Sequence, residues 1–245
     1  MFNGKKILCI IPARAGSCGL PGKNVLPIAG KPMIAHAIEK ALRVQEIDRI
    51  IVSTDSPMIA DIARSHGAEA PFLRSSDLAR DESPMIPVIV DAVDRLEVQG
   101  SKYDYAVMLQ ANSPHLQSDE IQAVINKIVL GEYDVVFTVC EISHPPQWSL
   151  CIDSVEPQFA FSDVADMASE RRQEMDVCYR STGAVYAVSI PYLLENEKTA
   201  RLCLPASNQR SAVVVTSQYS GVDVDTELDY LLAKAIFERN ASDDS

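Results

Sequence analysis

Two kinds of hydrophobic pattern alternate along the chain. Short, uncharged apolar runs are typical of strands buried in a parallel sheet, and segments with an apolar residue every three or four positions are typical of helices packed on such a sheet. The runs predict strands at 7–11, 49–53, 68–73, 105–109, 134–140, 183–188 and 212–216. The spaced segments predict helices at 34–42, from 57, at 84–97, from 118 and at 226–239; the stripe of the last is Leu228, Leu231, Leu232, Ala235 and Ile236. This alternation predicts an α/β fold, a mostly parallel central sheet flanked by helices.

The alternation is interrupted between residues 141 and 182. Residues 149–161 alternate only weakly between apolar and polar, and 162–178 are polar. We interpret 141–182 as an insertion, a hairpin plus a loop that serves as a lid or a dimer contact. Residues 1–240 are expected to form a single domain around this insertion, because a chain of 245 residues that is 47% hydrophobic suffices for one large core. Residues 241–245 are expected to be a polar, frayed tail.

Composition and charge exclude several classes of function. The net charge of −12 argues against non-specific binding of nucleic acid, whose phosphates would be repelled. Because no apolar run is long enough to cross a bilayer, we expect no membrane partner. The six cysteines are scattered without ligand spacing, which indicates a reduced, cytoplasmic protein without disulfides or a zinc site.

Residues 10–24 form a glycine-rich, basic loop that follows the first predicted strand. Glycines let backbone N–H groups approach an anion, and Arg14 and Lys23 add positive charge, so the loop is suited to phosphate. It is neither a Walker A loop nor a complete dinucleotide-binding motif. A surface loop without a ligand is the alternative. Arg14, Asp55, Arg74 and Gln110 all follow predicted strand ends, so we expect them to share one rim of the sheet, where ligands of such folds bind.

A second polar segment, residues 221–229, carries two aspartates that alternate with valine. If the segment is extended, Asp223 and Asp225 project to the same side, and paired carboxylates near a polyphosphate suit Mg²⁺. Thr226 and Asp229 have the spacing of a helix cap. The cap accounts for part of the acidity but leaves Asp223 and Asp225 unexplained. On residue type alone, metal binding and a purely structural role remain open.

The segment 10–24, IIPARAGSCGLPGKN, resembles I-P-A-R-x-G-S-K-G-L-P-x-K-N, the signature of the acylneuraminate cytidylyltransferases, also called CMP-sialic or CMP-nonulosonic acid synthetases. Residues 221–229 resemble that family's D-I-D-T-E-L-D motif, whose first two aspartates hold the catalytic metal. Weaker matches are residues 71–81 to P-F-x-R…L-A-x-D, 110–114 to Q-P-T-S-P, 171–173 to R-R-Q and 179–184 to Y-R-x-N-G-A.

The resemblance implies a Rossmann-like, GT-A-like nucleotidyltransferase fold and a homodimer formed through the inserted region. It implies transfer of CMP from CTP to a nine-carbon 2-keto sugar acid of the sialic, legionaminic or pseudaminic type, with Mg²⁺ or Mn²⁺ as cofactor. The implied catalytic residues are Arg14, Lys23, Asp223 and Asp225, the two aspartates being the metal ligands. The implied nucleotide-binding residues are Ala13, Arg14, Gly16, Ser17, Gly19, Lys23, Asn24, Arg74, Gln110, Asn112 and Ser113. The implied sugar-binding residues are Gln110, Arg172, Gln173, Tyr179, Arg180 and Thr182.

The chain departs from the family pattern at three positions. Cys18 replaces a lysine of the phosphate loop, His115-Leu116 replaces leucine-arginine, and Thr182 replaces an asparagine. Another basic residue, Lys31 for example, could compensate for the charge missing at Cys18. The alternatives are a CMP-Kdo synthetase, whose loop resembles A-R-x-x-S-x-R-L-P-G-K, and a degenerate nucleotide-binding module without turnover.

Overall fold

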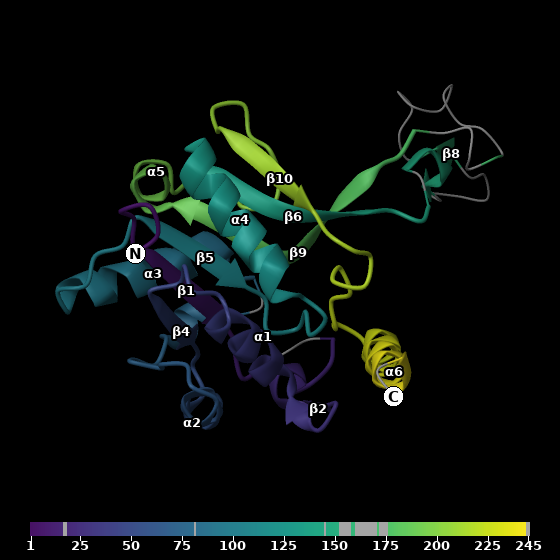
Figure 1. Cartoon of the computed structure of the whole chain (residues 1–245), viewed down its shortest axis with the longest axis horizontal. Coiled ribbons are helices and arrows are strands. Elements are labelled where there is room, and N and C mark those ends of the chain that lie inside the picture. The colour runs from purple at the N-terminus through teal and green to yellow at the C-terminus, as the bar shows by residue number, and fades with distance from the viewer. Residues whose placement is uncertain are drawn as a thin grey trace.

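The computed structural model describes residues 1–16, 19–80, 82–144, 146–151, 158–159, 171 and 176–243. A six-stranded sheet in the order β10-β6-β9-β5-β1-β4 forms its centre (Figure 1). These strands are β1 (Ile7–Pro12), β4 (Arg49–Ser53), β5 (Tyr105–Leu109), β6 (Val135–Glu141), β9 (Tyr179–Ser189) and β10 (Ser211–Val215). β1 pairs in parallel with β4 and β5, and β6 with β10, whereas β9 is antiparallel to β5 and β6. The predicted mostly parallel sheet is confirmed.

Helices cover both faces of this sheet. They are α1 (Met33–Leu42), α2 (Pro57–Ser65), α3 (Met85–Val98), α4 (Ser118–Gly131), α5 (Ile190–Glu195) and α6 (Glu227–Asp243), with short 3₁₀ turns η1 (Lys23–Val25), η2 (Ser76–Leu78) and η3 (Pro146–Trp148). Cys9 and Ile11 of β1 pack with α1, α2 and α4, and Leu8 and Ile10 pack with α3 and α5. Because successive β1 side chains enter opposite cores, the strand is apolar at every position. None of the helices in the described ranges is long and apolar enough to cross a membrane.

The segment 68–73 differs from its prediction as a strand. It makes only isolated bridges to the β4 region, Ile51 to Glu69 and Thr54 to Leu73. Pro71 lies between the two bridges and has no backbone N–H to donate to a ladder. Arg74 is still placed at the rim, because its N–H donates to the carbonyl of Thr54 at 2.8 Å.

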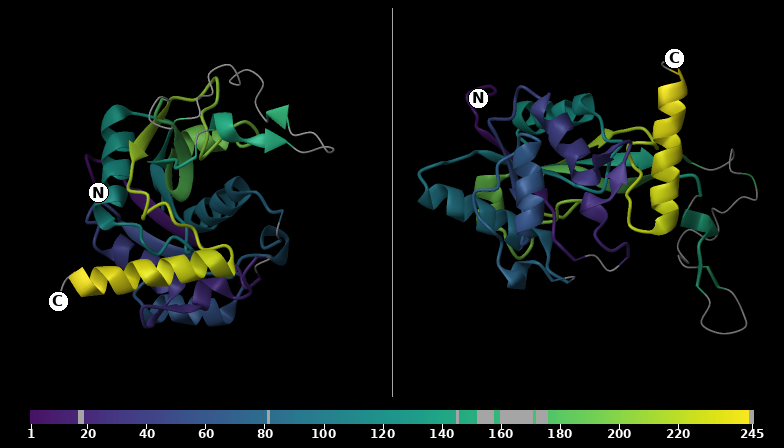
Figure 2. Two further views of the ribbon diagram at one scale, coloured as in Figure 1. Left: turned by 90° about the vertical axis from the view of Figure 1, so that its right-hand side faces the viewer. Right: turned by 90° about the horizontal axis from the view of Figure 1, so that it is seen from below.

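The C-terminal helix α6 lies outside the sheet, across one end of the molecule (Figure 2). The predicted packing stripe is confirmed only at Ile236, which is buried: Leu228, Leu231 and Leu232 are exposed at 75%, 56% and 49%, and Ala235 is exposed as well. The helix packs through Ala233, in a small core with Ile28 and Met33, and through Phe237, against that core and the rings of the buried histidines 36 and 115. The helix also continues to Asp243, into the segment predicted as a frayed tail.

Two small antiparallel pairs complete the fold. β2 (Pro27–Ile28) and β3 (Lys31–Pro32) form a hairpin whose turn residues Ala29 and Gly30 both have positive φ, 46° and 78°. β7 (Leu150–Cys151) pairs with β8 (Gln158–Phe159) at the end of an arm where β6 and β9 extend past β10 (Figure 1). The predicted hairpin in the insertion is therefore confirmed. Its lid or dimer role stays a prediction.

Candidate active site

A cavity of about 190 Å³ lies at the carboxyl ends of β1 and β5. Its basic and amide lining residues are Arg14, Lys23, Asn24, Arg74, Arg80, Gln110 and Asn112. Leu78, Met85 and Val88 contribute apolar surface from η2 and α3. Arg14, Arg74 and Gln110 thus share one rim, as their positions after strand ends predict. Asp55 belongs to the same rim, because it binds the loop that carries Arg14.

The phosphate loop is held at its start and at its end. The Ala13 N–H donates to the Ser53 carbonyl at 3.0 Å, and the Ala15 N–H donates to Asp55 Oδ1 at 2.8 Å. At the far end, the buried Asn24 donates from Nδ2 to the Arg14 carbonyl at 3.0 Å. Asn24 therefore closes the loop on itself, and β4 fixes where the loop begins.

The acidic segment is anchored through the valine between its two aspartates. Val224 is fully buried, and its N–H donates to the Asn112 carbonyl at 2.9 Å. Asp229 accepts hydrogen bonds from the backbone N–H groups of Asp225 and Thr226 at 3.2 and 2.8 Å. The predicted cap is confirmed. It fixes the loop before α6, and the carboxylates of Asp223 and Asp225 take no part in it.

The basic loop and the acidic segment meet, although about two hundred residues separate them in sequence. Lys23 Nζ lies 2.5 Å from Asp225 Oδ1, and Asn112 Nδ2 donates to the same oxygen at 3.0 Å. The Ser113 hydroxyl donates to Asp223 Oδ1. Gly19 lies directly against the backbone carbonyl of Asp225, with no space for a side chain. The convergence on which the interpretation of both motifs depends is confirmed.

Burial disfavours the charged form of two ionisable groups here. Burial, with Asp225 nearby, raises the pKa of Asp223 to about 6, although the hydrogen bond from Ser113 and the charges of Arg180 and Lys23 oppose the shift. Burial, with Arg14 nearby, lowers the pKa of Arg74, and Asp55 opposes that shift. Arg74 is only 6% exposed, and its Nε has no hydrogen-bond partner among the described residues. A cation beside Asp223 and a polar ligand beside Arg74 would each relieve a cost of burial.

The donor set around Asp223 and Asp225 fits a hard divalent cation. No group of three or more His, Cys, Asp or Glu occurs in the part of the chain that the structure describes, so a four-ligand structural metal site does not fit there. Mg²⁺ instead binds through one or two carboxylates and completes its shell with water and substrate phosphate. Two carboxylates beside a basic loop provide that arrangement.

The predicted sugar-binding residues are distributed unevenly. Gln110 donates from Nε2 to the Tyr186 hydroxyl at 2.7 Å, and Arg180 donates from its guanidinium to the Gly221 carbonyl at 2.7 Å. Tyr179 is half exposed at the start of β9. Thr182, by contrast, is buried and hydrogen-bonded to Thr138 within the sheet. Ser17, Cys18, Arg172 and Gln173 lie outside the described residues.

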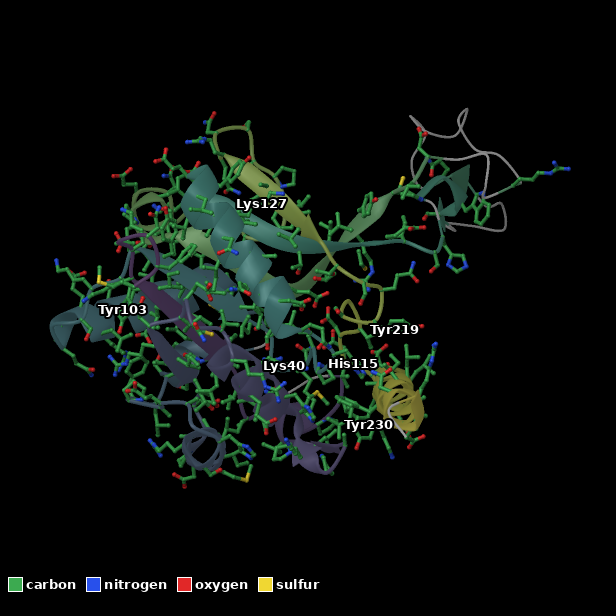
Figure 3. All side chains as sticks on the ribbon, in the orientation of Figure 1. Lys40, Tyr103, His115, Lys127, Tyr219 and Tyr230 are labelled. Atoms are coloured by element: carbon green, nitrogen blue, oxygen red, sulfur yellow. The ribbon has the colours of Figure 1, made fainter. Side chains whose placement is uncertain are left out.

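His115 and Lys31 stand apart from the cavity. His115 is buried beside α6 (Figure 3), where its Nε2 donates to the Ala233 carbonyl at 2.9 Å and its ring lies 4.3 Å from that of Phe237. Lys31 binds both carboxylate oxygens of Glu39 at 2.7 Å. His115 therefore anchors the C-terminal helix, and Lys31 is paired with α1.

The sequence did not reveal the residues that line the cavity from η2 and α3, nor Tyr186, which holds the side chain of Gln110. In the apolar run 183–188 it is simply one more strand residue, and its bond to Gln110 spans 76 positions. Burial raises its pKa, so the hydroxyl stays neutral. The one available signal was a phenol inside a run of small and β-branched residues, because a buried tyrosine hydroxyl usually has a partner.

Comparison with known proteins agrees with this geometry. A protein-family model described as cytidylyltransferase matches residues 8–188. The CMP-N,N'-diacetyllegionaminic acid synthase of Legionella pneumophila is 34% identical over 96% of this chain and 97% of its own length. The pseudaminic acid cytidylyltransferase of Campylobacter jejuni is 29% identical over 96% of this chain and 97% of its own length.

Among solved structures, CMP:2-keto-3-deoxy-manno-octonic acid synthetase complexed with CTP has a similar fold. It superimposes with a TM-score of 0.70 and 20% identity, covering 96% of this chain and 99% of its own. The family match spans most of the chain, including the phosphate loop and β1 to most of β9. The chain therefore belongs to the cytidylyltransferase family of nucleotidyltransferases.

Proposed function

We propose that this protein transfers CMP from CTP to a nonulosonic acid of the sialic, legionaminic or pseudaminic type and releases pyrophosphate. The observation that carries the proposal is the contact between Lys23 and Asp225 beside the cavity, which joins the loop proposed to bind phosphate to a carboxylate proposed to bind the metal. The names of the two full-length relatives indicate the sugar class. We further propose a cytoplasmic homodimer that uses the inserted region as its contact.

The nucleotide is proposed to lie in the cavity with its triphosphate on the loop. Arg14, Lys23 and the amides near Gly16, Ser17 and Gly19 would pair with phosphate oxygens. Arg74 would donate to the base or ribose, because ligand polar atoms would satisfy its buried guanidinium. Further contacts are assigned to Ala13, Asn24, Gln110, Asn112 and Ser113.

Asp223 and Asp225 would hold the divalent cation, Mg²⁺ or Mn²⁺. When bound, such an ion neutralises phosphate charge and lowers the pKa of a nearby attacking hydroxyl. Asp223 contributes best when ionised, and its pKa of about 6 means that the carboxylate is mostly charged at neutral pH even before a cation binds.

The sugar is proposed to lie on the arm side of Gln110. Arg180 and Arg172 would pair with its carboxylate, since a guanidinium matches a carboxylate in a bidentate fork. Gln110, Gln173 and Tyr179 would contact its hydroxyl and acyl groups. Thr182 would act from inside the sheet by fixing β9 at the irregularity next to Gly183, whose φ is +71° and which faces Asp223 Oδ2.

In the reaction, the anomeric hydroxyl oxygen attacks the α-phosphorus of CTP. The bond from that phosphorus to the bridging β-phosphate oxygen breaks, pyrophosphate leaves, and the hydroxyl proton is released to solvent. The chain needs no covalent intermediate. It contributes orientation, through Gln110 and Arg180, and stabilisation of phosphate charge, through Arg14 and Lys23.

A substrate panel tests the proposal. Purified protein is incubated with CTP and Mg²⁺ and, in turn, with N-acetylneuraminic, legionaminic, pseudaminic and the eight-carbon Kdo acids, while pyrophosphate release is followed. We expect release with at least one nine-carbon acid and little with Kdo. Turnover of Kdo alone would indicate the CMP-Kdo reaction. CTP binding without turnover of any acid would indicate a nucleotide-binding module.

A further inference from the structure

The ammonium of Lys23 lies at Asp225 where a metal cation bound by this carboxylate would be expected. Lys23 Nζ is 2.5 Å from Asp225 Oδ1, and Asn112 Nδ2 is 3.0 Å from the same oxygen. A carboxylate oxygen has two lone pairs, and here both face donors. In the nucleotide-free enzyme, this oxygen is therefore saturated by the chain itself.

Lys23 also has a second possible anion within reach. It lines the cavity together with Arg14 and Arg74, where the nucleotide phosphates are proposed to bind. Its side chain is only 20% exposed, whereas that of Asp225 is 61% exposed. The lysine thus lies between the carboxylate and the cavity, where its ammonium is placed to pair with either anion.

We propose that Lys23 serves as a resident counter-ion that suppresses divalent-cation binding at Asp225 until nucleotide phosphates draw its ammonium away. The inference rests on the proposed function, in which Asp225 is a metal ligand. An ammonium on Oδ1 blocks a lone pair and repels an incoming dication. A bound triphosphate reverses both effects, because it provides Lys23 with another partner and adds negative charge beside the carboxylates.

The consequence is a defined coupling between two ligands. Metal and nucleotide must strengthen each other's binding, since linkage is reciprocal. The free enzyme then keeps Asp225 paired with Lys23, and the cation enters with the nucleotide or after it. Removal of the lysine charge should uncouple metal binding from nucleotide binding. The Asp225 carboxylate can then bind a cation without nucleotide, while the nucleotide phosphates lose a contact.

Manganese binding in the absence of nucleotide tests this coupling. Free Mn²⁺ is measured by its EPR signal during titration of wild type, Lys23→Gln and Lys102→Gln. Lys102 is the matched control, because its Nζ makes an ion pair of equal length, 2.5 Å, with Glu97 far from the cavity. Thermal unfolding verifies that each variant is folded.

We expect Lys23→Gln to bind Mn²⁺ at least about tenfold more tightly than wild type, and Lys102→Gln to match wild type. The double variant Lys23→Gln/Asp225→Asn should lose that gain, which places the ion at Asp225. A non-hydrolysable CTP analogue should tighten Mn²⁺ binding strongly in wild type and weakly in Lys23→Gln.

Equal or weaker Mn²⁺ binding by Lys23→Gln would overturn the inference. So would a gain that survives Asp225→Asn. If Mn²⁺ binds wild type only with the analogue and Lys23→Gln behaves identically, the inference fails and the metal assignment stands. If no variant binds Mn²⁺ even with the analogue, the inference and the metal assignment fail together.

Discussion

Gly19 of the basic loop contacts the backbone of Asp225 in the acidic segment. Adding one methyl group at this position therefore tests whether the two segments must stay in contact. In Gly19→Ala, the new Cβ would overlap the carbonyl oxygen of Asp225 and stand 3.3 Å from its carbonyl carbon. Restoring ordinary van der Waals distances requires the loop and the acidic segment to separate by about 1 Å. A misplacement of about 1 Å among reacting groups costs on the order of 10² in rate, or about 2.7 kcal/mol of transition-state stabilisation.

Pyrophosphate release at saturating CTP and sugar acid measures this loss, and thermal unfolding measures stability. We expect kcat to fall about a hundredfold, while overpacking costs about 1–3 kcal/mol of folding free energy. Gly131→Ala is the matched control: its Cβ would overlap the ring of Tyr133, a side chain that can move, at the end of α4. A Gly19→Ala enzyme with wild-type kcat would refute the claim that these two segments act across one cleft.

Three further predictions follow from the same contacts. Asp225→Asn should lower kcat on the order of 10²–10³ without unfolding the protein, because one preorganised charge contact is lost; full pyrophosphate release in that variant would refute the metal assignment. Tyr186→Phe removes the hydrogen-bond acceptor of Gln110 and should raise KM about tenfold with an unchanged melting temperature, whereas Tyr192→Phe, away from the cavity, should have no kinetic effect. Burial lowers the pKa of His115 from 6.5 to about 4, so its neutral form stabilises the fold above pH 6.5, and that contribution, up to about 3 kcal/mol, is lost as the pH falls towards 4. Unfolding free energies between pH 7 and 4.5 should therefore fall less steeply for His115→Gln than for wild type, and parallel slopes would contradict this account.

Strands could be predicted where the apolar run is continuous. Such runs predict the interior strand β5 and the edge strand β4 at their observed bounds, Tyr105–Leu109 and Arg49–Ser53. The prediction fails beyond β4. Residues 68–73 are apolar enough for a strand, but Pro71 prevents a continuous ladder. The direction of β9 was also hidden, because hydrophobicity does not distinguish an antiparallel strand among parallel neighbours.

Helix α6 shows why periodicity alone can select the wrong face. Leu228, Leu231 and Leu232 have helical spacing, as do Ala233 and Phe237, and Ile236 fits either set. Tertiary contacts decide between the two faces. The His36–Phe237–His115 stack, with ring centroids 4.9 and 4.3 Å apart, and the hydrogen bond from His115 to the helix backbone fix the second face against the body.

At the site, the sequence predicted which kinds of residue are present, but not which side chains contact each other. The basic loop and the alternating aspartates are visible in the sequence because their chemistry is local. The contact between Lys23 and Asp225 depends on how the sheet brings residues 202 positions apart to one rim. Thr182 shows the converse: its motif position indicates the sugar site, yet its hydroxyl is turned inward to Thr138.

The central claim, CMP transfer by attack at the α-phosphorus, is tested most directly by ³¹P NMR of a single reaction mixture. Protein, CTP, Mg²⁺ and the best acid of the panel should convert the three CTP resonances into one phosphodiester signal of a CMP-sugar and one signal of pyrophosphate, in equal molar amounts. Formation of CDP and inorganic phosphate, or a spectrum that stays that of CTP although CTP is bound, would contradict the account.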